Sequence, residues 1–257
     1  DALRLADPAL VTVLHGDTDA TPPGIGALAS RSTGIGGGAL LLAAERLQDA
    51  ARPVAARLLN AAPDDVVPAP GGFALAFDAV RRVGWASLGP LAAEARFETT
   101  SEAWSAGCVI ARVALDADTG AVAVEHLAWA DDVGTIVNPM LAKGQMWGGL
   151  AQGIGEVFSE CIATDDAGTL LSGSFMDYAM PRADDMPRAV ALGAPAKPAR
   201  ALNNPLGAKG IGEAGTIGVP AALLNAISDA VGGLPDDVSL PLTPETIWRL
   251  LRRGGTP

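Results

Sequence analysis

Apolar residues recur along the chain at two spacings, and each spacing predicts a different kind of secondary structure. Spacings of three and four residues, which are typical of helices, occur over residues 39–59, 140–161, 219–231 and 243–252. Because proline removes a backbone donor, Pro53 is expected to divide the first segment into two helical pieces. Pro220 is expected in the first turn of the third helix, and Thr243 just before the fourth.

Shorter apolar runs bounded by turn-forming residues predict strands. They occur over residues 9–15, 73–77, 95–100, 107–116, 121–134 and 168–180. The stretch DADTG, residues 116–120, predicts a tight turn between the fourth and fifth of these strands, which would then form a β-hairpin. Residues 181–209 are rich in proline and predict a long connection of mixed character.

Composition narrows the class of protein. The 257-residue chain is 49% hydrophobic, so it can bury a sizeable core. It carries a net charge of −11, and its three lysines (Lys143, Lys197 and Lys209) form no basic stripe, so we expect no nucleic-acid partner. No apolar run reaches the roughly 18 residues of a membrane-spanning helix, and we expect a cytoplasmic protein without a membrane span.

The two cysteines and the first residue complete this picture. Cys108 and Cys161 are far apart and have no other ligand at metal-binding spacing, which favours free, buried thiols over a metal cluster or a disulfide. The sequence begins with Asp1, and no basic region followed by an apolar stretch is visible, so no signal peptide is predicted. We therefore expect the chain to be a piece of a longer protein.

Three segments are unusually rich in glycine. They are residues 24–38, 144–155 and 207–218. Glycine removes the Cβ that keeps a backbone away from a ligand and allows successive N–H groups to converge on an anion. Ser30, Ser32 and Thr33 add hydroxyl donors just before a helix, which favours a phosphate site there, although a flexible loop capped by serines remains an alternative.

The stretch GIGEAG, residues 210–215, fits the glycine pattern of dinucleotide-binding turns but contains Glu213. That fingerprint needs a hydrophobic strand before its first glycine, and residues 202–209 do not form one. A carboxylate would also repel a pyrophosphate, so a nicotinamide-dependent dehydrogenase is disfavoured. The apolar neighbours of Glu213 suit a general base with a raised pKa, and a solvated loop glutamate is the alternative.

The stretch NPLGAKGIGEAGTIGVPAALLNAISDAV resembles the C-terminal signature of molybdenum hydroxylase large subunits, the family of xanthine dehydrogenase, aldehyde oxidase and carbon monoxide dehydrogenase. Three further stretches fit the family in the same order along the chain. They are residues 16–33, 131–156 and 173–187. Together with the intervening pattern they extend the resemblance over nearly all of the chain.

This resemblance implies an α+β fold. Residues 1–257 are expected to form the C-terminal part, or C-terminal lobe, of a molybdopterin-binding domain of the xanthine dehydrogenase and aldehyde oxidase type. We expect two similar sheet-and-helix sub-lobes, over approximately residues 1–130 and 131–257.

The resemblance also implies a cofactor and residues that serve it. The cofactor would be molybdopterin with molybdenum, in its cytosine dinucleotide form, and the family uses no protein ligand to the metal. Glu213 takes the place of the family's catalytic base, which removes a proton from the oxygen destined for the substrate. The expected cofactor-binding residues are Ala29, Ser30 and Ser32 near the phosphates, Gln145 and Gln152 at the pterin or pyrophosphate, and Lys209, Gly210 and Gly212 before the base.

The implied activity is hydroxylation of an aldehyde or an N-heteroaromatic carbon, with water as the oxygen donor. The chain would be an oxidoreductase subunit that acts on a small-molecule substrate only in a complex. Its expected partners are a companion chain with the N-terminal part of the molybdopterin subunit, an iron-sulfur subunit and a flavin subunit with FAD. The alternatives are a non-catalytic cofactor-binding or assembly subunit, a carbon monoxide dehydrogenase-like member and a reductase of aromatic thioesters.

Overall fold

The computed structural model describes residues 2–5, 7–24 and 26–253, and the chain forms two compact units, each described by itself. Unit 1 comprises Asp1–Glu102 and Leu202–Leu206, and unit 2 comprises Ala103–Ala201 and Gly207–Pro257. These units do not coincide with the approximate sub-lobes 1–130 and 131–257, because residue 130 lies within strand β5 (Val122–Asp132). Ile25, which falls in the first glycine-rich segment, lies outside the described residues.

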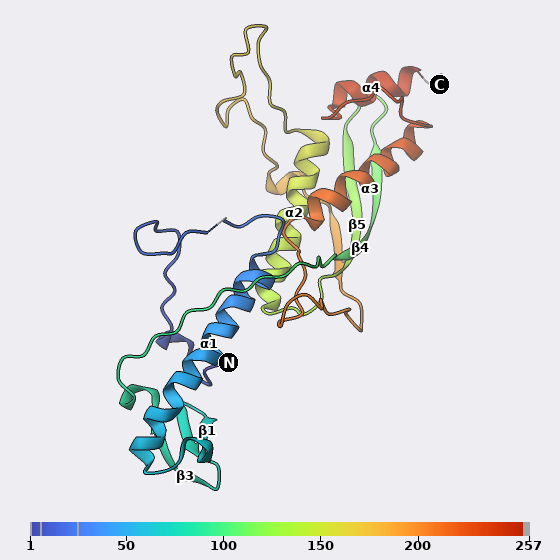
Figure 1. Cartoon of the computed structure of the whole chain (residues 1–257). Helices are drawn as coiled ribbons and strands as arrows, with labels where there is room; N and C mark the ends of the chain where they lie inside the picture. The colour runs from blue at the N-terminus through green and yellow to red at the C-terminus, as the bar shows by residue number, and fades with distance from the viewer. Residues whose placement is uncertain (1, 6, 25, 254–257) are drawn as a thin grey trace. The chain divides into compact units, whose positions relative to one another are not determined.

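Unit 1 consists of one long helix against a small sheet (Figure 1). Helix α1 (Ser32–Leu59) packs on strands β1 (Val66–Ala69), β2 (Gly72–Leu75) and β3 (Asp78–Gly84). The strands are antiparallel in the order β1-β2-β3. This arrangement buries one stripe of the helix and all four residues of the central strand β2.

The core of unit 1 depends on small residues in α1. Ala51 and Ala55 are completely buried, and their short side chains let the sheet approach the helix closely. Phe73 of β2 fills the space between the layers, with its ring centroid 5.2 Å from that of Trp85 in an edge-to-face arrangement. The helix ends at Asn60, whose left-handed backbone closes the last turn.

Helix α1 differs from its sequence prediction. It begins at Ser32 rather than at residue 39, and it continues through Pro53 without dividing into two pieces. Proline removes one helical hydrogen bond, but the buried Ala51 and Ala55 on either side of it hold both parts of the helix against the sheet. Tertiary packing therefore outweighs the local preference, and four glycines, Gly34 and residues 36–38, become helical.

Unit 2 is built around a mixed three-stranded sheet (Figure 1). Strand β4 (Ala106–Leu115) pairs antiparallel with β5, and β5 pairs in parallel with β6 (Ala189–Gly193). Helices α2 (Pro139–Phe158) and α3 (Ala214–Val231) pack on each other, and α3 also packs on β4. Helix α4 (Pro244–Arg253) adds Ile247 and Leu250 to the same hydrophobic core.

The predicted β-hairpin is confirmed, and its turn contacts α4. The Asp116 carboxylate accepts the backbone N–H groups of Asp118 (2.9 Å) and Thr119 (3.2 Å) and so fixes the turn. Gly120 has a φ of +74°, and a Cβ at this position would overlap the carbonyl of Pro244. Glycine is required here both by backbone conformation and by the approach of α4.

Helix α3 also starts earlier than its pattern predicts. It begins at Ala214, so Pro220 lies inside the helix rather than in its first turn. By length and composition alone α3 is long and apolar enough to cross a membrane. One face of α3, which includes Leu223 and Ile227, is fully buried in the core of unit 2.

Three strand predictions are wrong, and three strands, β1, β3 and β6, were missed. Residues 9–15, 95–100 and 168–180, all of which the structure describes, contain no strand. A strand needs a hydrogen-bonded neighbour, and residues 9–15 begin instead at the end of a short 3-10 helix, Pro8–Leu10. Strand β6 lies within the proline-rich connection, where Val190 and Leu192 alternate with exposed residues over only five positions.

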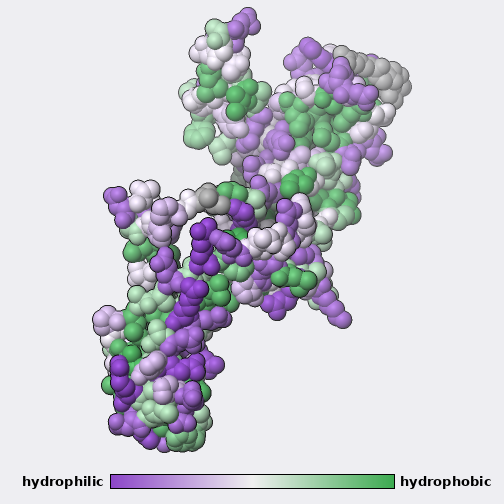
Figure 2. Space-filling view, viewed as in Figure 1, coloured by the Kyte–Doolittle hydropathy of each residue, from purple (hydrophilic) through white to green (hydrophobic). Residues whose placement is uncertain are grey.

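An arm of unit 2 projects beyond the end of α2 (Figure 1). It comprises residues 160–180, and it has an isolated bridge between Thr164 and Leu170. Phe175 is 84% exposed and Met176 is 97% exposed. Figure 2 shows hydrophobic residues on the visible surface of this arm. Apolar side chains so exposed are typical of a surface that another polypeptide covers.

Candidate functional site

Helices α2 and α3 cross at a pair of glycines. A Cβ on Gly149 would lie 3.0 Å from the Cα of Gly215, and a Cβ on Gly215 would overlap the Gly149 backbone. One turn further, a Cβ on Gly153 would lie 2.8 Å from the Cβ of Val219 and 3.1 Å from the Pro220 ring. The sequence correctly indicated a close approach to this backbone, but at these positions the neighbour is α3.

Glu213 stands at the start of α3, two residues before this crossing. Its carbonyl accepts the N–H of Ile217 (3.2 Å) and the hydroxyl of Thr216 (2.9 Å), so its backbone belongs to the first helical turn. Its side chain makes no capping hydrogen bond and is exposed. The apolar enclosure expected from the sequence is therefore not supplied by the described residues of this chain.

Gln145 and Gln152 share a stripe of α2 with Gly149, because residues separated by three, four and seven positions lie on one face of a helix. The contacts of Gly149 with Gly215 and of Gly153 with Val219 show that α2 and α3 run in the same direction. Gln145 therefore lies at the level of the loop before α3, and Gln152 lies at the level of its first turns. Both side chains are exposed.

The residues just before Glu213 are anchored by strand-like contacts. The backbone N–H of Lys209 donates to the carbonyl of Val133 (2.9 Å). The Lys209 ammonium lies 3.5 Å from the Asp132 carboxylate, and its side chain is only 10% exposed. Gly210 and Gly212 are half-buried in the four-residue connection that follows. Unit 2 thus brings together six of the expected site residues, since Gln145, Gln152 and Glu213 border the same crossing.

Two acidic residues at the end of β5, Asp131 and Asp132, lie close to the residues that precede Glu213. Asp131 lies opposite Gly107 in the hairpin and is 4% exposed, and its Oδ2 accepts no hydrogen bond. Burial, together with the nearby charge of Asp132, raises the pKa of the Asp131 carboxyl. Asp132 accepts the N–H groups of Ala199 (2.9 Å) and Gly134 (3.0 Å), which hold its pKa below the usual range. The only signal in the sequence was a pair of acids at a strand end.

Ala29, Ser30 and Ser32 lie in unit 1, at the start of α1. Ala29 and Ser30 both have a φ of +52°, in the left-handed region. Arg31 occupies the N-cap position but makes no side-chain capping bond, and the first turn of α1 contains no acidic residue. The N–H groups of that turn therefore meet no carboxylate from the turn itself, an arrangement that suits an anion.

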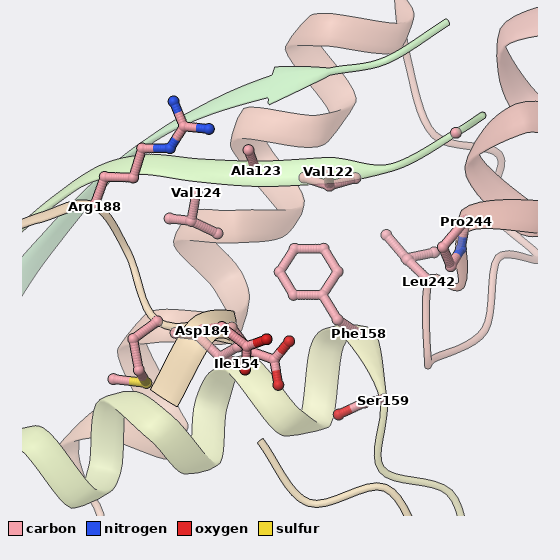
Figure 3. Close-up of a pocket in the computed structure, with 13 residues that line it drawn as sticks. Val122, Ala123, Val124, Ile154, Phe158, Ser159, Asp184, Arg188, Leu242 and Pro244 are labelled. Atoms are coloured by element: carbon pink, nitrogen blue, oxygen red, sulfur yellow. The ribbon is translucent and has the colours of Figure 1, made fainter. Parts of the chain in front are cut away.

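A cavity of about 350 Å³ lies elsewhere in unit 2 (Figure 3). Val122 and Val124 of β5, Phe158 at the end of α2 and Leu242 give it an apolar side. In Figure 3 the guanidinium of Arg188 points away from this interior. The cavity contains none of the expected site residues, so the exposed face at the α2–α3 crossing remains the better candidate.

The described residues contain no group of three or more His, Cys, Asp or Glu side chains that could hold a metal ion. Cys108 and Cys161 are free, as expected, but both are exposed, so the prediction that they are buried is wrong. Cys108 lies on β4, the outer strand of its sheet, where one edge and one face remain open.

Solved structures define the class of this fold. A Cu,Mo-CO dehydrogenase in its carbon monoxide reduced state matches 98% of the chain, with a TM-score of 0.82 and 26% identity over 33% of its own chain. Quinoline 2-oxidoreductase from Pseudomonas putida 86 matches 91% of the chain, with a TM-score of 0.77 and 30% identity over 32% of its own chain. The fold is therefore that of a molybdopterin domain.

The chain belongs to the molybdopterin cofactor-binding domain family, whose model matches residues 1–187. The chain is also 32% identical to the 6-hydroxypseudooxynicotine dehydrogenase complex subunit gamma of Paenarthrobacter nicotinovorans. That match covers 96% of this chain and 33% of the relative. The chain thus spans about a third of the length of the relatives it matches, and it includes the Glu213 loop beyond the family model.

Proposed function

We propose that this chain supplies the C-terminal lobe of the large subunit of a molybdenum-dependent hydroxylase. The enzyme would oxidise an N-heteroaromatic carbon, or an aldehyde, with water as the oxygen donor. Membership of the molybdopterin cofactor-binding family supports the cofactor. The names of three relatives, a nicotine 6-hydroxylase large subunit, a quinoline 2-oxidoreductase and the dehydrogenase subunit described above, favour the N-heteroaromatic class.

The chemistry of the exposed face fits the organic part of such a cofactor. A Cβ on Gly144 or Gly148 would meet nothing within 4 Å, so space is open beside the two glutamines. Gln145 and Gln152 offer amide donors and acceptors to a pterin edge or a pyrophosphate linkage. We propose the other contacts as follows: the connection through Lys209, Gly210 and Gly212 borders the cofactor, and Ala29, Ser30 and Ser32 at the start of α1 bind its phosphates.

Glu213 is the proposed catalytic base, and its placement is the observation that carries the function. The carboxylate is exposed at the start of α3, and the glycine crossing fixes the backbone that bears it. When bound, the molybdenum centre would accept the two electrons removed from the substrate carbon. The Oε atoms of Glu213 would accept the proton from the water that supplies the oxygen atom. A positioned base of this kind contributes about 10²- to 10⁴-fold to the rate.

The companion components are also proposals. We propose the cytosine dinucleotide form of the cofactor, and iron-sulfur and FAD subunits that carry the electrons onward in the cytoplasm. The names of the relatives, "large subunit", "large chain" and "complex subunit gamma", support a multi-subunit assembly. The exposed apolar arm at Phe175 and Met176 supports a companion polypeptide that carries the remaining part of the large subunit.

The decisive experiment replaces Glu213 by Gln in the assembled enzyme. Turnover of an N-heteroaromatic substrate should fall by about 10²- to 10⁴-fold, while the molybdenum content stays unchanged. Glu245→Gln is a matched control, because Glu245 is an exposed glutamate in the first turn of α4. Full turnover by the Glu213→Gln variant with normal metal content would contradict the base role and favour a non-catalytic cofactor-binding subunit.

A further inference from the structure

Three separate segments of unit 2 meet immediately before the Glu213 loop. The N–H of Thr135 donates to the carbonyl of Gly207 (2.9 Å), and the N–H of Ala201 donates to the same carbonyl (3.0 Å). Gly134 and Ala208 form an antiparallel bridge. Residues 133–135, 199–201 and 207–209 thus form one hydrogen-bonded junction, which we call the clasp.

The Asp132 carboxylate binds the clasp with both oxygens. Oδ1 accepts the N–H of Gly134 and lies 3.5 Å from the ammonium of Lys209, while Oδ2 accepts the N–H of Ala199. Its side chain is 19% exposed and that of Lys209 is 10% exposed. An ion pair so shielded from water is screened less than a surface pair. One carboxylate therefore links a residue from each of the three segments.

The clasp is tightly fitted as well as hydrogen-bonded. Gly134 has a φ of +67° and Gly207 a φ of +71°, a conformation that favours glycine. A Cβ on Gly134 would overlap the carbonyl of Gly207 and lie 3.3 Å from the Cγ of Lys209. Any movement of residues 207–209 relative to β5 would therefore disturb several contacts together.

Glu213 is held between the clasp and the helix crossing. Only residues 210–212 separate Glu213 from Lys209, and Gly215 packs on Gly149 just beyond it. We infer that Asp132 is a positioning residue for Glu213, acting through Lys209 and the clasp. This inference rests on the proposed function of Glu213, because a positioning role has meaning only if the carboxylate must occupy a defined place.

The substitution Asp132→Asn separates these contacts with little change of shape. The amide nitrogen cannot accept one of the two backbone N–H groups, and the charge opposite Lys209 disappears. Displacing a catalytic group by about 1 Å can cost about 10²-fold in rate. We therefore expect turnover of the assembled enzyme to fall by about 10- to 100-fold, with molybdenum content unchanged.

Hydrogen exchange gives a readout that does not depend on turnover. In the assembled Asp132→Asn variant, amides of residues 199–201 and 207–213 should exchange at least about 10-fold faster, because the bonds that hold the clasp are weakened. Asp116→Asn is the matched control, since Asp116 also accepts two backbone N–H groups but at the other end of the hairpin. That variant should change exchange only near residues 116–120 and leave turnover intact.

Comparison with Glu213→Gln separates the two hypotheses. If Asp132 acts through Glu213, Asp132→Asn should cause no further loss of turnover in a Glu213→Gln background. A further loss there, or unchanged exchange and turnover in the single variant, would overturn the positioning role while leaving the base role intact. Full turnover by Glu213→Gln alone would instead reject the base role, whatever happens at Asp132.

Lys209 provides a second route if Asp132→Asn fails to fold. Lys209→Arg keeps the positive charge opposite Asp132 and should retain the slow exchange at residues 207–213. Lys209→Met removes the charge and should speed the exchange of the amides of residues 207–213 about as much as Asp132→Asn does. Slow exchange at residues 207–213 in Lys209→Met would mean that the ion pair does not hold the clasp, which would overturn the positioning role.

Discussion

Both units contain a long helix with a run of glycines, and the neighbours of those glycines differ. In unit 1, Gly36 has open space beside it, and a Cβ on Gly38 would meet only the ring of Phe97, at 3.0 Å. In unit 2, Gly149 meets the backbone of Gly215. A flexible side chain can move aside, but a helix backbone cannot do so without breaking its own hydrogen bonds.

This difference separates two reasons for glycine in a helix. In α1, Gly36 has room for a larger residue, and a Cβ on Gly37 or Gly38 would press only on the side chain of Leu206 or Phe97. In α2, Gly149 and Gly153 are required for the close crossing with α3, and that crossing fixes the backbone of Glu213. The buried carboxylate adds a second contrast, since Asp131 of unit 2 is the one charged side chain buried among the described residues.

The largest effect should come from Gly215→Ala. The new Cβ would overlap the Gly149 backbone, so α2 and α3 must separate and expose part of the core of unit 2. We expect a loss of about 3 kcal/mol in the free energy of unfolding, measured by denaturant titration. Gly148→Ala is the control, because a Cβ there meets nothing within 4 Å. Equal stability of the two variants would show that the crossing does not need glycine.

The N-cap residues of α2 and α1 should also contribute differently to stability. The Asn138 side chain accepts the N–H groups of Met140 (3.0 Å) and Leu141 (3.2 Å) at the start of α2, whereas Arg31 makes no side-chain cap at the start of α1. Asn138→Ala should cost about 1 kcal/mol of unfolding free energy. Arg31→Ala should change it by less than about 0.5 kcal/mol. Thermal unfolding of both variants tests this, and a larger loss for Arg31→Ala would reverse the comparison.

The buried carboxyl of Asp131 should make stability depend on pH. Its pKa in the folded state is raised above the ordinary value of 3.8. Between pH 3.8 and the raised pKa, the folded state therefore binds more protons than the unfolded state. Stability falls as the pH rises through this range. Asp131→Asn should remove this fall and stabilise the protein at pH 7, with no gain below pH 3.8. Unfolding titrations between pH 3.5 and 7 measure the difference, and a uniform loss at every pH would contradict it.

The pH dependence of stability due to Asp116, at the hairpin turn, should have the opposite sign to that due to Asp131. The backbone N–H groups of Thr119 and Asp118 lower the pKa of Asp116, so its contribution is present above pH 3.8 and is lost as the pH falls. Asp116→Asn should therefore reduce stability at pH 7 and have no effect at low pH. If the stability change caused by Asp131→Asn and that caused by Asp116→Asn vary with pH in opposite directions, burial explains the first effect and backbone hydrogen bonds explain the second.

The smallest effect is expected for Gly36→Ala in α1. Alanine has a higher helix propensity than glycine, and the site has open space, so unfolding of unit 1 should require about 0.5 kcal/mol more free energy. Gly38→Ala, which must displace the Phe97 ring slightly, should gain less. A loss of stability in Gly36→Ala would mean that α1 glycines also pack closely in the assembled protein.

Local pattern was enough to find most regular elements of unit 2. The spacing of apolar residues predicted α2, α4 and the β4–β5 hairpin, because these elements satisfy their backbone hydrogen bonds within a short stretch of chain. It missed β6 in unit 2 and β1 and β3 in unit 1, and it wrongly predicted strands at residues 9–15, 95–100 and 168–180. A strand depends on a partner elsewhere in the chain, which a local pattern does not specify.

The sequence by itself determined the identity of the candidate site: the family resemblance, Glu213 in its glycine loop, and the glutamines of α2 follow from the order of residues alone. Only the tertiary structure decided why Gly149 and Gly153 are glycines and that Asp132 binds Lys209. These contacts join segments far apart in the chain. Close packing and shielded ion pairs arise from such long-range approaches, so they leave only a weak trace in the local pattern.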